Sequence, residues 1–290
     1  MAWQESPLVD SFHLWRRMAL SSALDVHFDL GLAAYDVKDQ AGVEKQRTAI
    51  AMLPEGGAGC LEFKALDWRV AWLAGRDQEA LAIAKEIVAE HPHDVDAVLE
   101  LAQILNDLDQ GEEAIRVLVA AVERSPEDAD LWFELGYAAE RAGVWPLRDR
   151  AFREVWKLEH DQAPRQRLFL PDEPFIEAVE KTLEKLPKGV RSAIGNVAIF
   201  VEDYPDEWVV EEAIADPRIL GLFDGPTRDA EGASFAPSTG PSRIYIYRWN
   251  IERYCRSADE VAEQVEITVL HEIGHYLGLD EDALHARGLG

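Results

Sequence analysis

The sequence predicts an α+β protein, with an all-helical array in its N-terminal part and a smaller domain of strands and helices after it. Three observations lead to this fold class. A pattern of small residues and prolines recurs at a regular interval, apolar residues alternate along a short segment near residue 245, and an amphipathic helix near the C-terminus contains the motif H-E-x-x-H. We expect three regions, 1–60, 61–164 and 165–290.

The composition excludes several classes of protein. The chain is 48% hydrophobic and 29% charged, as in globular proteins, and its net charge of −26 repels nucleic-acid phosphates and anionic membranes, so we expect neither as a partner. The first residues lack the pattern of a signal peptide, and no apolar run approaches the ~18 residues of a membrane span. Cys60 and Cys255 have no metal-ligand spacing, which favours reduced thiols and a cytoplasmic location.

The region 1–60 favours two or more helices. Apolar residues recur at helical spacing at Phe12, Trp15, Met18 and Ala19, and again at Leu24, Phe28 and Leu32. The proline and glycines of residues 54–59 predict a loop that ends this region. Two interpretations stay open: separate helices, or a degraded copy of the repeat that follows.

A repeated unit is found between about residues 61 and 162. Pro126 stands one repeat length after Pro92, and each of these prolines lies at the end of a predicted helix. Ala80 and Ala114 keep the same interval at the start of a second helix. The small residues allow two helices to approach closely, and each proline ends the second helix of a pair. We expect three units, which begin near Leu61, Val95 and Ala129.

This unit resembles the tetratricopeptide repeat, a helix–turn–helix of about 34 residues, and its interval matches that length. The signature positions are filled by Trp132, Leu135 and Gly136, with Phe152 in the partner helix, while Arg148 stands where alanine is usual. The resemblance implies a groove that binds a peptide or helix of a partner protein. The alternative is a spacer that only orients the domain attached to it.

The pattern changes near residues 170–174, where we place the junction to the second domain. Apolar residues between Phe175 and Leu186 predict a helix. Asn196–Asp203 predicts a strand that is apolar on both faces and therefore interior, and Ile219–Gly225 predicts another short strand. Residues 226–241 are rich in Gly, Pro, Ser and Thr, which indicates a surface loop.

A third strand is predicted at Arg243–Arg248, where isoleucines and tyrosines alternate strictly. Two interpretations apply to Tyr245 and Tyr247. They are packing residues of a half-buried strand, or the strand lines a cleft and pairs with the backbone of an extended substrate.

The motif H-E-x-x-H lies on a helix with clear ends. Ser257 and Glu260 fit a capping box at its start, and Gly278 is suited to a left-handed turn at its end. His271 and His275 stand one helical turn apart, so their imidazoles can bind a single Zn²⁺. Glu272 beside them can take a proton from a metal-bound water.

A third ligand is expected from the acidic run that follows Gly278. Asp280, Glu281 and Asp282 all return close enough to the histidines. The alternative is an amphipathic helix with solvated histidines, followed by solvated acidic residues.

Residues 165–290 resemble the small zincin-like metallopeptidases sometimes called minimal gluzincins. The resemblance is carried by these segments in order: Leu220–Gly225, Arg243–Arg248, Val261–Val265, Thr268–His275 and Gly278. It implies a short mixed sheet packed on helices, zinc on His271 and His275, and Glu272 as the base. In the family pattern H-E-x-x-H-x-x-G-x-x-D, Glu281 takes the place of the usual aspartate. Asp280, Asp282 and His285 remain the alternatives for that ligand.

The sequence therefore predicts a cytoplasmic zinc metallopeptidase whose repeats recruit a substrate or partner. Tyr245, Tyr247, Tyr276 and Arg243 are the candidates for a donor that stabilises the oxyanion. The alternative function is a repeat adaptor protein whose zinc domain is structural or inactive.

Overall fold

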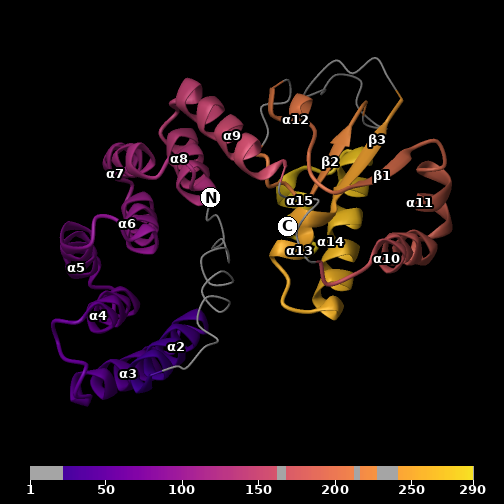
Figure 1. Ribbon diagram of the computed structural model, residues 1–290. Helices are drawn as coiled ribbons and strands as arrows, with labels where there is room; N and C mark the ends of the chain where they lie inside the picture. Colours follow the sequence, from indigo (N-terminus) through magenta and orange to yellow (C-terminus); the bar gives the residue numbers. More distant parts are fainter. Residues whose placement is uncertain (1–21, 162–167, 212–215, 227–240, 290) are drawn as a thin grey trace. The chain divides into compact units, whose positions relative to one another are not determined.

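A computed structural model describes residues 22–161, 168–211, 216–226 and 241–289 (Figure 1). The chain divides into two compact units, Met1–Val155 and Trp156–Gly290. This division falls inside helix α9 (Trp145–Glu159), whereas the sequence begins the third region at residue 165 and places the junction near residues 170–174. Within the described ranges, no helix is both long and apolar enough to cross a bilayer.

The described part of the first unit, from residue 22 onward, is all-helical, as the sequence predicts. Its helices are α2 (Ala23–Asp36), α3 (Gln40–Met52), α4 (Leu61–Leu73), α5 (Asp77–Glu90), α6 (Val95–Asp107), α7 (Gly111–Arg124), α8 (Ala129–Arg141) and most of α9. The three repeats begin at α4, α6 and α8, and these helices start at the three predicted residues. The second helices of the pairs, α5, α7 and α9, keep the same interval.

Two features allow the helices of a pair to pack together: small residues where the helices touch, and turn residues in the left-handed conformation. Gly136 of α8 lies against Phe152 of α9 so closely that a Cβ atom at Gly136 would collide with the ring. The turns inside the three pairs contain Gly75, Asp109 and Gly143, all with positive φ. Glycine adopts this conformation without strain, and aspartate tolerates it better than most residues.

The region before the repeats also forms a helical pair. Leu24, Phe28 and Leu32 lie on α2, as predicted, and pack against a core of Val43, Ile50, Leu66 and Val70. Gly31 allows this approach, because a Cβ atom there would stand 2.6 Å from Leu66. The predicted helical segment from Phe12 to Ala19 lies outside the described residues.

The second unit combines a small sheet with helices. Its helices are α10 (Asp172–Lys185), α11 (Lys188–Ala193), α12 (Glu207–Glu211), α13 (Arg248–Arg253), α14 (Ala258–Tyr276) and α15 (Glu281–His285). Its strands are β1 (Ala198–Glu202), β2 (Gly221–Asp224) and β3 (Arg243–Tyr247). All three predicted strands are present, while residues 227–240 of the predicted loop lie outside the described part.

The sheet is mixed, with the strand order β1-β3-β2. β1 runs parallel to β3, with Glu202 opposite Tyr247, and β2 runs antiparallel to β3, with Gly221 opposite Ile246. The prediction that the first strand is interior is wrong for the described sheet, since β1 lies at its edge and Phe200 is 42% exposed. The alternative that β3 pairs with a substrate is also wrong, because β1 and β2 occupy both of its edges.

Alternation along β3 separates the two faces of the sheet. Ile244 and Ile246 face the core formed with the apolar stripe of α14, and Figure 1 shows this helix against the sheet. Tyr245 faces the other way, where it stacks on Phe200 at 5.4 Å and meets Trp208 at 5.8 Å.

Helix α14 begins and packs much as the sequence predicts. The Ser257 hydroxyl accepts a hydrogen bond from the Glu260 backbone N–H at 3.2 Å. The reciprocal half of the capping box differs, because the Glu260 carboxylate accepts from the N–H of Arg256 at 2.6 Å. The stripe Val261, Val265, Val269 and Ile273 is buried in the core.

Candidate metal centre

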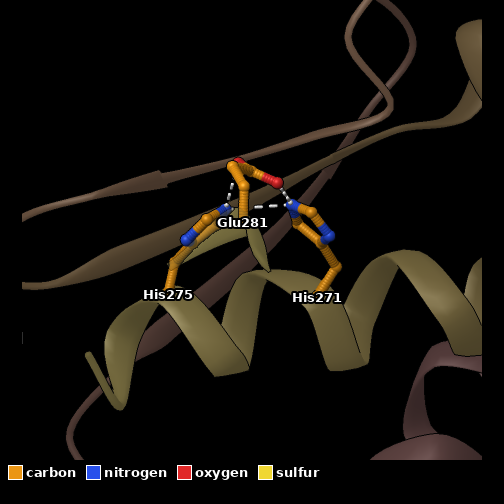
Figure 2. A group of neighbouring side chains, drawn as sticks. All are labelled: His271, His275 and Glu281. Carbon is orange, nitrogen blue, oxygen red and sulfur yellow. Dashed lines mark hydrogen bonds and ion pairs between the residues drawn. The ribbon is translucent and has the colours of Figure 1, made fainter. Parts of the chain in front are cut away.

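Three side chains of types that can bind a metal converge at the C-terminal end of α14. His271 and His275 project from the same side of this helix, and Glu281, the first residue of α15, turns its carboxylate toward both rings (Figure 2). One ligand atom from each residue lies within 4.8 Å of the others. The structure thus brings together the two histidines of the motif and the third ligand that the family pattern places at Glu281.

Backbone carbonyls orient both imidazole rings. The Nδ1 atom of His271 donates to the Leu289 carbonyl at 2.5 Å, and Nδ1 of His275 donates to the Leu279 carbonyl at 3.2 Å. A carbonyl can only accept, so each Nδ1 carries the proton and each Nε2 keeps its lone pair. Partners of this kind fix the tautomer of metal-binding histidines.

The geometry of this group fits a tetrahedral cation. The two Nε2 atoms face one another at 2.9 Å, and Nε2 of His275 lies 3.2 Å from the Glu281 carboxylate. Ligands about 2.0–2.1 Å from a tetrahedral zinc stand roughly 3.3 Å apart. Nε2 of His271 lies 4.0 Å from the same carboxylate, and a proton or a metal ion shared by these groups would relieve the repulsion between them. The residues therefore fit Zn²⁺.

Burial favours the metal-binding form of His275. The pKa of His275 is lowered below its ordinary value of 6.5 by burial first and by the neighbouring His271 second. A lowered pKa keeps this imidazole neutral, which is the form that binds a metal.

The alternatives for the third ligand have other places in the structure. The Asp280 carboxylate caps α15 by accepting from the Ala283 N–H at 2.9 Å. Asp282 and His285 lie on α15, and neither belongs to the ligand group found among the described residues.

Two glycines bring α15 back onto α14. Gly278 has a φ of 84°, so the chain reverses directly after α14. Gly274 faces α15, where a Cβ atom would collide with the buried side chain of Leu284. The close contact at Gly274 places Glu281 within reach of the histidines.

Glu272 is buried beside the edge strand β2. Its side chain accepts a hydrogen bond from the Phe223 N–H, and a Cβ atom at Gly221 would stand 2.8 Å from its Oε1 atom. Burial raises the pKa of the Glu272 carboxyl to about 8, the Phe223 N–H lowers it, and the charge of Glu281 raises it further. The helix therefore presents a carboxyl with a strongly raised pKa next to a metal ligand, as is common at catalytic sites.

The candidate cleft and oxyanion residues lie elsewhere. Arg243 stands 4.0 Å from Asp224 at the start of β3, and Tyr245 belongs to the aromatic cluster on the sheet face away from α14. The Tyr276 hydroxyl donates to the carbonyl of Ala193 at 3.0 Å. Among the described residues, the structure brings none of these three into the ligand group.

Tyr247 is closer to Glu272. Burial raises its pKa, and the charges of Glu202 and Glu272 act in the same direction. Its buried hydroxyl has no hydrogen-bond partner among the residues the structure describes.

The sequence reasoning missed four residues that act through the backbone or through a missing side chain: Gly221, Phe223, Leu279 and Leu289. A backbone carbonyl or N–H has no residue-type signal, so no motif could identify Phe223, Leu279 or Leu289. Gly221 follows a short apolar run, and a glycine inside a strand is a sign of close approach by another group.

Comparison with known proteins finds two family matches. Residues 194–290 match the family model of zincin-like metallopeptidases, and residues 71–139 match a tetratricopeptide repeat model. The chain therefore carries a zincin-like metallopeptidase domain preceded by tetratricopeptide repeats. No curated protein matches the chain at a significant level.

Similar solved structures cover about half of the chain. One is "MamA 41-end from Desulfovibrio magneticus RS-1", which is 16% identical over 50% of this chain and 81% of that chain, with a TM-score of 0.38. Another is "Crystal structure of MamA", 15% identical over 49% of this chain and 81% of that chain, with a TM-score of 0.40. These scores are too low to support a functional assignment.

Proposed function

We propose that the C-terminal domain is a zinc-dependent peptidase that hydrolyses peptide bonds. The observation that carries the proposal is the group of His271, His275 and Glu281, with Glu272, the residue after His271, buried against β2. Zinc bound there supplies a Lewis acid and a water of lowered pKa. His271, His275 and Glu281 would hold the ion, and three protein ligands are typical of catalytic rather than structural zinc sites.

In this proposal, Glu272 moves the protons. Its carboxylate takes a proton from the attacking water and passes it to the departing amine of the cleaved peptide. The hydrogen bond from the Phe223 N–H holds the carboxylate in place. Because Gly221 has no side chain, the β2 backbone lies close to this carboxylate.

We place the substrate along β2. Among the described residues, β2 has β3 as its only strand partner, and its other edge faces Glu272, which accepts from the Phe223 N–H. The same strand holds Glu272 through Phe223. A peptide bound beside this edge would therefore have its backbone next to the base.

The decisive experiment compares Glu272→Gln with Glu263→Gln, a matched change at an exposed position of the same helix. Both variants should retain zinc, because neither loses a ligand. Hydrolysis of a denatured protein mixture should fall by about 10²–10⁴ in Glu272→Gln, as expected for removal of a general base, and stay unchanged in Glu263→Gln. Equal hydrolysis by the two variants would sink the assignment of Glu272.

The tetratricopeptide repeats support a second role, the binding of a protein partner or substrate. If the zinc-loaded wild type hydrolyses no peptide pool while the repeats still capture a partner, the chain is an adaptor with an inactive zinc domain. Zinc content, hydrolysis and partner capture, measured on the full chain, separate these two functions.

A further inference from the structure

The turn that ends α15 makes an unusual contact with the metal centre. The chain passes from α15 through Gly288, whose φ is 71°, to Leu289. The Leu289 N–H donates to the Leu284 carbonyl at 3.1 Å, and the Gly288 N–H donates to the His285 carbonyl at 3.0 Å. This pair of bonds around a left-handed glycine is a Schellman motif, which fixes the direction of the chain after a helix.

The fixed direction aims one carbonyl at a metal ligand. The Leu289 carbonyl accepts from Nδ1 of His271 at 2.5 Å. Leu284, where the turn is anchored, is fully buried against Gly274 of α14. One short helix therefore carries a ligand at its start, Glu281, and the partner of another ligand just beyond its end.

We infer that Gly288 and Leu289 are positioning residues of the metal centre, which hold His271 in the tautomer and orientation that bind zinc. The inference rests on the same metal site as the proposed function and is tested by zinc binding alone. Partners that orient metal-binding histidines typically change metal affinity about 10–100-fold when they are removed.

Two truncations form a matched pair. A chain that ends at Arg287 lacks the Leu289 carbonyl, whereas a chain that ends at Leu289 offers a terminal carboxylate at the same place. We expect the zinc Kd, measured in competition with a chelator, to rise about 10–100-fold in the first chain and to stay at the wild-type value or below it in the second. Gly288→Ala, a milder change, strains the turn at positive φ and should raise the Kd by a smaller factor.

Nuclear magnetic resonance of the zinc-loaded protein separates positioning from folding. The Nδ1 protons of His271 and His275 should both exchange slowly with water in the wild type, because each is bonded to a carbonyl. In the chain that ends at Arg287, only the His271 proton should become fast-exchanging. An unchanged Kd, or the loss of both slow protons together, would overturn the inference. Zinc binding without hydrolysis by the wild type would instead overturn only the proposed function.

Discussion

Glu281 is the most exposed of the three proposed ligands. Its side chain is 72% exposed, compared with 22% for His271 and 27% for His275. An exposed carboxylate gains little from a charged neighbour in water, so its place beside the histidines depends mainly on the position of α15. Substitution of Glu281 is therefore the most direct test of the proposed set of ligands.

Replacement of Glu281 by Gln should raise the zinc Kd on the order of 100-fold or more, because the site loses its only anionic ligand. Asp282→Asn is the matched control and should leave the Kd near that of the wild type. Chelator competition measures both values. A larger loss in Asp282→Asn or Asp280→Asn would move the third ligand to that residue.

Glu272 should reduce the stability of the metal-free protein. Burial raises its pKa from 4.5 to about 8, so the folded state holds this proton to a higher pH than the unfolded state does. The free energy of unfolding therefore falls as the pH rises from about 4.5 to 8. Glu272→Gln removes this dependence and should be more stable than the wild type at pH 8 by a few kcal/mol, roughly.

Urea unfolding of the metal-free proteins between pH 4 and pH 8 tests this expectation. The two curves should meet near pH 4 and separate toward pH 8, while Glu263→Gln should follow the wild type throughout. Parallel curves for Glu272→Gln and the wild type would contradict the burial of the carboxylate.

At the scale of elements, the contact between α14 and α15 joins packing to metal binding. Gly274 lies inside a helix, where alanine would ordinarily be the better residue by about 1 kcal/mol. Here a Cβ atom would collide with Leu284 of α15. Gly274 therefore lowers the helix propensity of α14, but it allows α15 to pack closely enough to bring Glu281 near the histidines.

Gly274→Ala should raise the zinc Kd about tenfold or more although every ligand remains, because α15 must shift away. Gly189→Ala in α11 is the control, since a Cβ atom there meets nothing within 4 Å. Isothermal titration or chelator competition gives the two values. A Gly274→Ala variant that is more stable and binds zinc normally would show that α15 has room to adapt.

The elements were predictable to different degrees. The starts of α4, α6 and α8 follow directly from the repeat interval, and the zinc helix follows from its cap and its apolar stripe. The order of the strands was not predictable, because alternation along Arg243–Tyr247 reveals two faces but not the neighbours at each edge. For the same reason, the tyrosines of β3 could not be assigned to a cleft or to packing before the topology was known.

At the scale of the whole molecule, a buried ionic cluster links the end of α9 to the zincin-like domain. The Glu159 carboxylate is buried and accepts from the Tyr204 hydroxyl at 2.9 Å, from Arg218 at 2.6 Å and from Arg253 at 3.2 Å. All four residues belong to the second unit. The last turn of α9 is thus part of the folding unit that holds the metal site.

A fragment of residues 145–290 should therefore be more stable than a fragment of residues 165–290. The shorter fragment leaves Arg218 and Arg253 without the carboxylate of Glu159, and loss of one member of a buried ionic cluster costs about 3–5 kcal/mol. Glu159→Gln in the longer fragment should reproduce most of the difference. Chemical denaturation measures all three, and equal midpoints for the two fragments would contradict the role of Glu159.

The parts that hold the metal and the part that steadies the base come from different stretches of the chain. Both imidazoles, the Glu281 carboxylate and the two carbonyls behind the rings lie within residues 271–289, whereas the N–H that holds Glu272 belongs to β2. Under the proposed function, damage to β2 would leave molecules that still bind zinc but no longer hydrolyse peptides. A preparation judged intact by its metal content alone could therefore be largely inert.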